Sequence, residues 1–207
     1  MKSDVLEDIY LDIMMETLES IFDRGIRDKG KTKVINHSKI ITKNEIQSIL
    51  NLLHSDYDNL GAEITIYKNK YQPLLRVLNP CKSGLHYETF KMVFKRIIGG
   101  NHFRGIISLF PFNHYFKSDE EYKLFLTYDI LHEIRHAYQR IHKEKKYHVH
   151  NQNYIDATKS GYANQWLERD ANQFATRMMN KYKNKINEIL NVKLEWNCIW
   201  GRFIFKR

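Results

Sequence analysis

The sequence predicts an α+β fold in which a small mixed sheet precedes two long helices. Strand-like segments are concentrated in residues 61–117, and long helical patterns occupy residues 118–190. The chain has 207 residues, of which 43% are hydrophobic and 28% charged, which is the composition of an ordinary globular protein. We find no internal repeat and no change of composition that would mark a linker, so residues 1–207 are predicted to form one domain.

The N-terminal part, residues 1–60, is predicted to be helical. Apolar residues recur at near-helical spacing over residues 3–24. A second helix is predicted to begin after Thr42 and to run to about His54, because Thr42 and Glu45 match a capping box.

The middle part, residues 61–117, is predicted to contribute the sheet. Residues 61–68 alternate as in a half-buried strand, and residues 71–78 are expected to pair with them at an edge, because they contain a proline. Residues 103–110 form another strand-like run, whereas the pattern of residues 87–98 leaves helix and strand open.

Two helices dominate the C-terminal part of the sequence. Ser118 and the acidic residues that follow it predict a helix over residues 118–142. A second helix is predicted over residues 163–190, and the segment between the two is expected to be a polar, basic loop. The aromatic tail, residues 191–207, is predicted to add a final strand.

The net charge of +9 favours acidic partners such as nucleic acid, an anionic protein or a membrane surface. The basic residues are scattered, however, and the densest run, residues 143–146, includes an acid, so a solvated basic surface is the favoured interpretation. Acidic residues interrupt the N-terminal apolar pattern, and no apolar run approaches the roughly 18 residues of a spanning helix. We therefore expect a cytoplasmic chain without a membrane partner. Two cysteines, Cys81 and Cys198, exclude a disulfide framework and a four-cysteine zinc cluster.

The predicted helix over residues 118–142 contains the motif HEIRH, from His132 to His136. Residues four apart lie on one face of a helix, so both imidazoles can bind a single ion. Glu133 can reach a water molecule on that ion without being a ligand itself. The arrangement is typical of zinc metallopeptidases, and an exposed helix with two histidines is the alternative interpretation.

A zinc ion that acts in catalysis needs a third protein ligand and an open fourth position. Glu168 lies in the next predicted helix, on a face that it shares with Ala171, Ala175 and Met179. A carboxylate on an otherwise small and apolar face needs a cationic partner, which a metal ion can supply. The alternative is that Glu168 only complements the helix dipole.

The segments LHEIRHAYQ and LERDANQFA resemble gluzincin-type zinc peptidases, in particular small bacterial and phage intracellular peptidases of the ImmA/IrrE kind. The resemblance covers residues 118–182. It implies a zincin-like fold, in which a mixed small sheet packs on an active-site helix and a second helix supplies the third zinc ligand, Glu168. It also implies one Zn²⁺ per chain and an orienting role for Asn172 toward His132. Asp170 is the alternative ligand, although its position on the helix should point it elsewhere.

The implied chemistry is hydrolysis of a peptide bond by zinc-activated water, with Glu133 as general base. A second donor to the oxyanion is expected, and the sequence does not choose among the candidates. These candidates are Tyr162, Tyr154, Tyr138, His148 and His150. The resemblance also suggests that residues 103–110 form an edge strand above the active helix and bind an extended substrate, with an internal strand as the alternative.

Two functions from different classes stay open. The first is an intracellular zinc peptidase that acts on a peptide or protein substrate. The second is a non-catalytic zinc-containing binding or regulatory module that acts through its basic surface on protein or nucleic acid. The presence of Glu133 favours the enzyme, because a structural zinc site does not need it. A second metal site at His142, His148 and His150 is not favoured, and the sequence does not indicate the oligomeric state.

Overall fold

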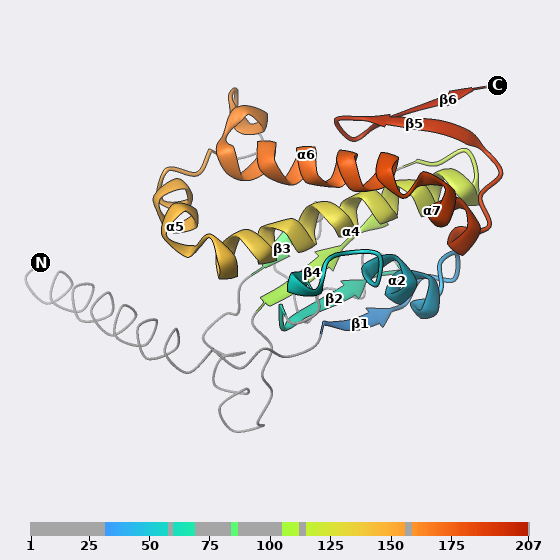
Figure 1. Ribbon diagram of the computed structural model, residues 1–207, viewed down its shortest axis with the longest axis horizontal. Helices are drawn as coiled ribbons and strands as arrows, with labels where there is room; N and C mark the ends of the chain where they lie inside the picture. Colours follow the sequence, from blue (N-terminus) through green and yellow to red (C-terminus); the bar gives the residue numbers. More distant parts are fainter. Residues whose placement is uncertain are drawn as a thin grey trace, which may run out of the picture.

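The structure is a computed structural model that describes residues 32–57, 60–68, 84–86, 105–111, 115–155 and 159–206. Within these residues helices and strands are mixed, which confirms the α+β class. The central helix lies between the sheet on one side and the C-terminal helices on the other (Figure 1). The elements predicted over residues 3–24, 71–78 and 87–98 lie outside the described residues. None of the described helices combines the length and the apolar content that crossing a bilayer requires.

The main sheet has four strands in the described part of the chain. In spatial order they are β1 (Lys33–Asn36), β2 (Ala62–Ile66), β4 (Gly105–Leu109) and β3 (Gly84–His86). The first three run parallel, and β3 pairs antiparallel with β4. Strand β1 falls in the part of the sequence that was predicted to be helical, and β2 is buried along its whole length rather than half-buried. Both faces of β2 are covered, so its side chains do not need to alternate between apolar and polar.

The position of β4 corrects the prediction for residues 103–110. Strand β4 lies between β2 and β3, so it is internal, and β3 is at the edge of the sheet as described. The prediction that residues 103–110 offer an open edge to a substrate is therefore wrong. The sequence pattern of residues 103–110 indicates a strand, but it does not indicate which strands lie beside it. The strand order depends on pairing with segments far away in the sequence.

The described helices are α2 (Lys43–Leu50), α4 (Asp119–His142), α5 (Glu144–Gln152), α6 (Trp166–Lys181) and α7 (Lys183–Leu190). The capping box of α2 is confirmed, because the Thr42 hydroxyl accepts from Glu45 N and the Glu45 carboxylate accepts from Thr42 N. The start of α4 is also confirmed, since the Ser118 hydroxyl accepts from Glu121 N. Both helices begin at short-range signals that the sequence contains.

Two predictions between residues 143 and 190 are wrong. Helix α5 occupies part of the segment that was predicted to be a loop, and it buries one large side chain, Tyr147. The single helix predicted over residues 163–190 is a 3-10 turn, Tyr162–Asn164, followed by α6 and α7, which are separated at Tyr182. Neither glycine nor proline marks this break in the sequence, so local pattern did not reveal it.

The aromatic tail forms a hairpin rather than one strand. Strands β5 (Glu195–Ile199) and β6 (Arg202–Lys206) pair antiparallel and form a sheet of their own. Trp200 and Gly201 connect them, both with positive φ. A Cβ atom at Gly201 would lie 3.0 Å from the ring of Tyr128, which is closer than an ordinary contact, so the ring would have to shift.

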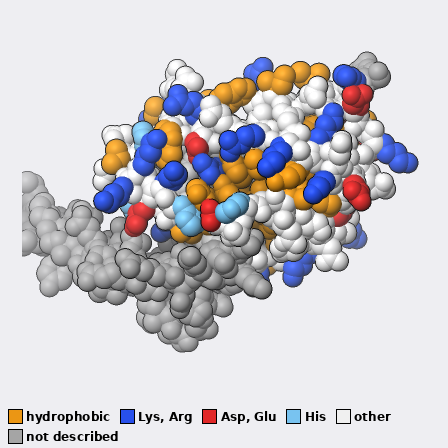
Figure 2. Space-filling model, viewed as in Figure 1, with side chains coloured by type: hydrophobic (Ala, Val, Ile, Leu, Met, Phe, Trp, Pro, Cys, Tyr) orange, Lys and Arg blue, Asp and Glu red, His pale blue; other side chains and the backbone are white. Residues whose placement is uncertain are grey.

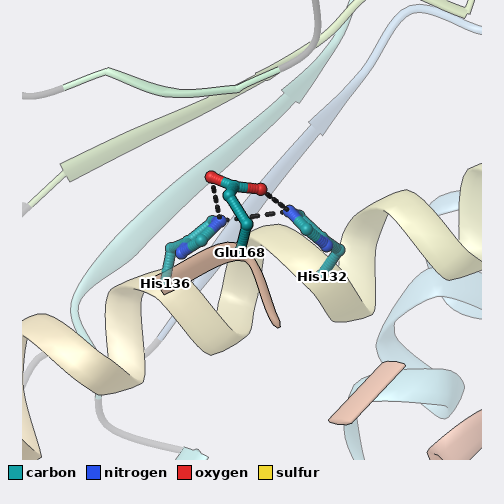
Figure 3. Close-up of side chains that lie close together, drawn as sticks. All are labelled: His132, His136 and Glu168. Carbon is teal, nitrogen blue, oxygen red and sulfur yellow. Dashed lines mark hydrogen bonds and ion pairs between the residues drawn. The ribbon is translucent and has the colours of Figure 1, made fainter. Parts of the chain in front are cut away.

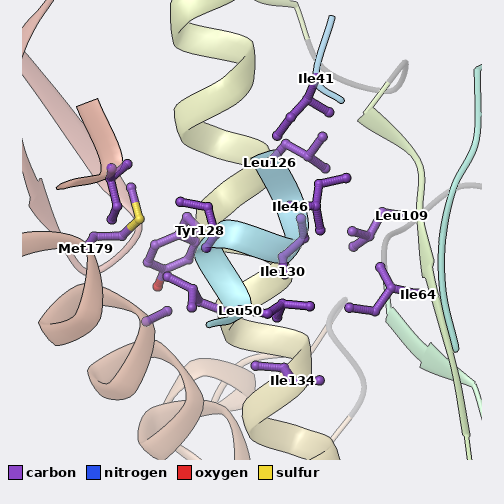
Figure 4. Packing of buried hydrophobic residues seen from close by; sticks show 14 of the residues in the cluster. Ile41, Ile46, Leu50, Ile64, Leu109, Leu126, Tyr128, Ile130, Ile134 and Met179 are labelled. Carbon is purple, nitrogen blue, oxygen red and sulfur yellow. The ribbon is translucent and has the colours of Figure 1, made fainter. Parts of the chain in front are cut away.

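The hydrophobic core extends along α4. Figure 4 shows Leu126, Ile130 and Ile134 facing Ile64 and Leu109 of the sheet, while α4 also turns side chains toward α6 and the hairpin. Because α4 is packed on both sides, only a narrow part of its surface reaches solvent. The side chains of the HEIRH motif are held on a helix that cannot rotate without breaking this packing.

Candidate metal centre

Helices α4 and α6 position the three side chains that the sequence singles out. His132 and His136 lie one turn apart on α4, and Glu168 lies in the first turn of α6. The two helices run side by side and make the most extensive contact between any two of the described elements (Figure 1). The buried alanines Ala171 and Ala175 lie on the packed face of α6, and their small size lets the helix backbones approach closely.

The ligating atoms of these three side chains converge. Figure 3 shows both imidazole rings directed at the carboxylate of Glu168. The His132 Nε2 and His136 Nε2 atoms are 3.0 Å apart, and they lie 3.3 Å and 3.5 Å from the Glu168 carboxylate oxygens. Among the described residues, this is the group of His, Cys, Asp or Glu side chains whose atoms could hold a metal ion.

The spacing of these atoms fits a zinc ion. Ligand atoms at about 2.1 Å from one ion and at tetrahedral angles lie about 3.4 Å from one another. The two imidazole nitrogens are 3.0 Å apart, and each lies near a different oxygen of Glu168, His132 Nε2 at 3.3 Å from Oε2 and His136 Nε2 at 3.5 Å from Oε1, so these distances are close to this value. Two neutral nitrogen donors and one carboxylate also form one of the usual ligand sets of catalytic zinc, in which a fourth position is open. The donor atoms that the chain provides therefore fit the ion that the resemblance implies.

Burial and charge couple the three side chains. The Glu168 side chain is only 3% exposed. Burial raises its pKa, but hydrogen bonds from both imidazoles outweigh this and hold the pKa well below its usual range. Burial likewise lowers the pKa of His136, while Glu168 and the charge of Glu133 outweigh it and raise the pKa to about 9. The two imidazoles therefore favour the ionised form of this buried carboxylate.

Glu133 lies beside this cluster with part of its carboxylate unpaired. The residue is buried, and its Oε2 atom has no hydrogen-bond partner among the described residues. A buried carboxylate oxygen without a partner is costly, and such atoms in native structures commonly have a functional role. Glu133 follows His132 in the chain, and its charge acts on His136, so it is an electrostatic neighbour of the cluster.

Residues 84–186 match the model of a family described as "Protein of unknown function (DUF3920)". The matched range includes all of α4 and the whole of α6, and so all of the converging side chains. No curated protein and no solved structure matches the chain. The segment that is similar to this family therefore contains the two site helices, and the match assigns no chemistry to them.

Two tyrosines from the segment before α6 lie against the cluster of His132, His136 and Glu168. The Tyr154 hydroxyl donates to Glu168 Oε1 at 2.9 Å, and the ring of Tyr162 lies edge-on to that of Tyr154. Burial raises the pKa of both phenols, and the nearby carboxylate of Glu168 raises them further, so both remain donors. The side chain of Gln165 bonds both the N–H and the C=O of Ile155, which closes the segment and fixes Tyr154 in place.

The remaining candidate donors have other neighbours. The ring of Tyr138 stacks between Tyr57 and His142. His150 lies against the ring of Trp166, and His148 is exposed, 3.9 Å from Glu144 on its own helix. Of the five candidates from the sequence, the structure therefore brings only Tyr154 and Tyr162 to the cluster.

Asn172 does not have the neighbour that the resemblance implies. Its Oδ1 atom accepts a hydrogen bond from the Tyr128 hydroxyl at 2.8 Å. The Nδ1 atom of His132 is buried and has no hydrogen-bond partner among the described residues. The structure thus places Asn172 on Tyr128 and not on His132. Helix α6 crosses α4 at an offset that places the amide one turn before the histidine.

Asp170 points away from the three converging atoms, as its position on the helix predicted. Its carboxylate forms two bonds to the Arg135 guanidinium, at 2.7 and 3.1 Å, and accepts a third from Gln139 Nε2. Gln139 and Arg135 were not among the residues predicted from the sequence. Nothing in the sequence marks these two residues as part of the site, because they meet their partners only where α4 packs on α6.

Asp129 is a further acid that the sequence analysis missed. It lies on α4, three residues before His132, and burial together with the negative charge of Glu133 raises its pKa to about 7, although His132 acts in the opposite direction. A carboxyl with a shifted pKa so close to the HEIRH motif is typical of functional sites. The spacing of Asp129 to the motif, one helical turn, was the signal that could have identified it.

Proposed function

We propose that this chain is a zinc-dependent peptidase of zincin-like architecture, in which His132, His136 and Glu168 hold one Zn²⁺. The observation that supports this most is that Glu133, a buried carboxylate whose Oε2 atom has no hydrogen-bond partner among the described residues, follows His132 beside three side chains that could hold an ion. A zinc site that only stabilises a fold is closed by four ligands and has no need of such a group.

The chemistry divides between the ion and the chain. When bound, the ion would act as a Lewis acid that lowers the pKa of a water molecule and polarises the substrate carbonyl. Glu133 accepts the proton that the water loses and returns it to the departing amine, so the proton is conserved. Tyr154 and Tyr162 are the candidate hydrogen-bond donors to the negative charge that develops on the carbonyl oxygen.

The peptide-binding edge belongs to β3 in this proposal. Strand β3 contacts α4 and lies at the edge of the described sheet, antiparallel to β4. An extended peptide can add to an edge strand through main-chain hydrogen bonds, which gives affinity without a strong requirement for particular side chains. The substrate class is therefore an extended segment of a peptide or protein.

The test separates metal binding from catalysis. Glu133→Gln keeps the shape of the side chain, but the amide cannot accept a proton. Zinc should stay bound at close to full occupancy, measured by elemental analysis, while cleavage of a peptide library falls by about 10²–10⁴-fold. Glu188→Gln, the same change at an exposed acid on α7, is the matched control and should leave cleavage unchanged. Equal cleavage by Glu133→Gln and wild type would contradict the mechanism.

A second candidate is a zinc-containing module that binds an acidic partner without cleaving it. Figure 2 supports this candidate, because Lys and Arg side chains are spread over the face that carries α4 and α6, and the net charge of the chain is +9. Wild-type protein that holds zinc, cleaves no peptide of the library and binds an acidic protein or nucleic acid with a steep salt dependence would favour this module.

A further inference from the structure

A connected set of hydrogen bonds extends from His136 away from the proposed metal centre. His136 Nδ1 lies 2.9 Å from Gln139 Oε1, three residues further along α4. Gln139 is fully buried, and its Nε2 atom donates to Asp170 Oδ2 at 2.8 Å and to the Leu167 carbonyl at 2.9 Å. Asp170 is in turn held by the guanidinium of Arg135, which lies inside the HEIRH motif.

The partners of Gln139 determine which way its amide faces. A carbonyl oxygen and an ionised carboxylate can only accept hydrogen bonds, so the group that contacts Leu167 and Asp170 must be the amide nitrogen. The amide oxygen must then face His136. That oxygen can only accept, so His136 carries a proton on Nδ1. In the neutral ring the lone pair is consequently on Nε2, the atom directed at His132 and Glu168.

The ion pair between Arg135 and Asp170 explains why the Gln139 amide cannot rotate to exchange its oxygen and nitrogen. Arg135 holds both oxygens of Asp170 and also donates to the Tyr57 hydroxyl at 2.6 Å. The guanidinium also lies over the rings of Tyr138 and Phe174, at 4.6 and 5.1 Å. A bidentate Arg–carboxylate pair in this setting has one geometry and little rotamer freedom. Arg135 balances the negative charge of Asp170, and the acceptor that His136 Nδ1 meets is the neutral amide oxygen of Gln139 instead of a carboxylate.

We propose that Gln139 is a positioning residue that fixes the Nδ1–H tautomer of His136 and directs its Nε2 atom at the metal, and that the Arg135–Asp170 pair holds Gln139 in orientation. This inference rests on the proposed metal centre. It assigns the orienting role to Gln139 and His136, whereas the resemblance implied Asn172 and His132. Only one of the two histidines is supported in this way among the described residues, since His132 Nδ1 lacks a partner.

Metal affinity measured apart from stability tests the inference. Gln139→Met has a similar length and no amide, so it leaves His136 Nδ1 without an acceptor. Zinc affinity, measured by competition with a chelator, should fall by about 10–100-fold, the loss that is usual for partners which orient a ligand. The absorption bands of the Co²⁺-loaded variant should also change, because they report ligand geometry.

The matched control is Asn187→Leu. Its amide oxygen accepts from Trp196 Nε1 at 2.7 Å, far from the centre in α7, so the change removes a comparable bond. Urea unfolding in chelator measures the stability of both metal-free variants. We expect both to lose stability, and only Gln139→Met to lose zinc affinity. If both retain wild-type zinc affinity, Gln139 is a structural residue and the inference is wrong.

A second measurement needs no variant. Nitrogen NMR of the histidine rings in the zinc-loaded wild-type chain should show His136 protonated on Nδ1 and bound through Nε2. Coordination through Nδ1 would overturn the inference even if Gln139→Met failed to fold. A wild-type chain that binds no zinc at all overturns the proposed metal centre itself, and that result is obtained before any variant is compared.

Discussion

Zinc binding should depend steeply on pH, because a proton competes with the metal for His136. Burial lowers the pKa of His136 in the metal-free protein, but Glu168 and Glu133 outweigh it and raise the pKa to about 9. The pKa lies above neutrality, so the proton must leave before the ring can bind an ion. At pH 7, two units below this pKa, about 1% of the rings are free of the proton, so the apparent affinity should be about 100-fold below its value above pH 9.

The affinity should therefore rise about tenfold for each pH unit between 7 and 9. Competition with a chelator of known proton affinity measures this slope, and calorimetry in two buffers of different ionisation enthalpy measures about one proton released at pH 7. Glu168→Gln is the informative variant, because it removes the main cause of the raised pKa of His136. Its affinity should be lower throughout, but its slope above pH 7 should be flatter. A wild-type affinity that is constant from pH 7 to 9, with no proton release, would refute the reasoning.

Three further predictions concern stability. In the presence of a chelator, the free energy of unfolding should fall as the pH rises from about 6.5 through about 9. The pKa of His136 is raised in the folded protein, so its ion pair with Glu168 stabilises the fold fully below this range and is lost above it. Urea titrations at several pH values measure this change. Zinc should raise Tm for wild type, not at all for Glu168→Ala, and by an intermediate amount for Asp170→Ala. Gly201→Ala should lower the free energy of unfolding by about 1–2 kcal/mol or more in urea, since φ is +74° and a Cβ atom would meet the Tyr128 ring.

The features that the sequence predicted best are those determined within one or two helical turns. The capping signals at Thr42 and Ser118 place the starts of α2 and α4 correctly. The spacing of His132 and His136 puts both rings on one face of a helix wherever that helix packs. Glu168 was identified because a carboxylate on an apolar face needs a partner, and the structure does bring it between the two rings.

The features that the sequence did not predict depend on how distant segments pack. Helix α5 is polar, and what holds it includes the burial of Tyr147 and the contact of Lys146 with the Trp166 ring at 4.1 Å. The internal place of β4 depends on its pairing with two distant strands. The partners of Gln139 and Asn172 depend on the offset between α4 and α6, which a pattern on either helix alone does not contain.

The charge of Glu168 must be balanced both in the metal-free protein and in the proposed zinc-bound protein. A buried carboxylate such as Glu168 needs a cation nearby, and in the metal-free protein the proton on His136 provides it. On the proposed function, a zinc ion replaces this single positive charge by two. The Oε2 atom of Glu133, beside this centre, is buried and has no hydrogen-bond partner among the described residues. The arrangement therefore provides a folded metal-free state that a proton on His136 stabilises, and on the proposed function Glu133 is the base beside the ion that replaces this proton.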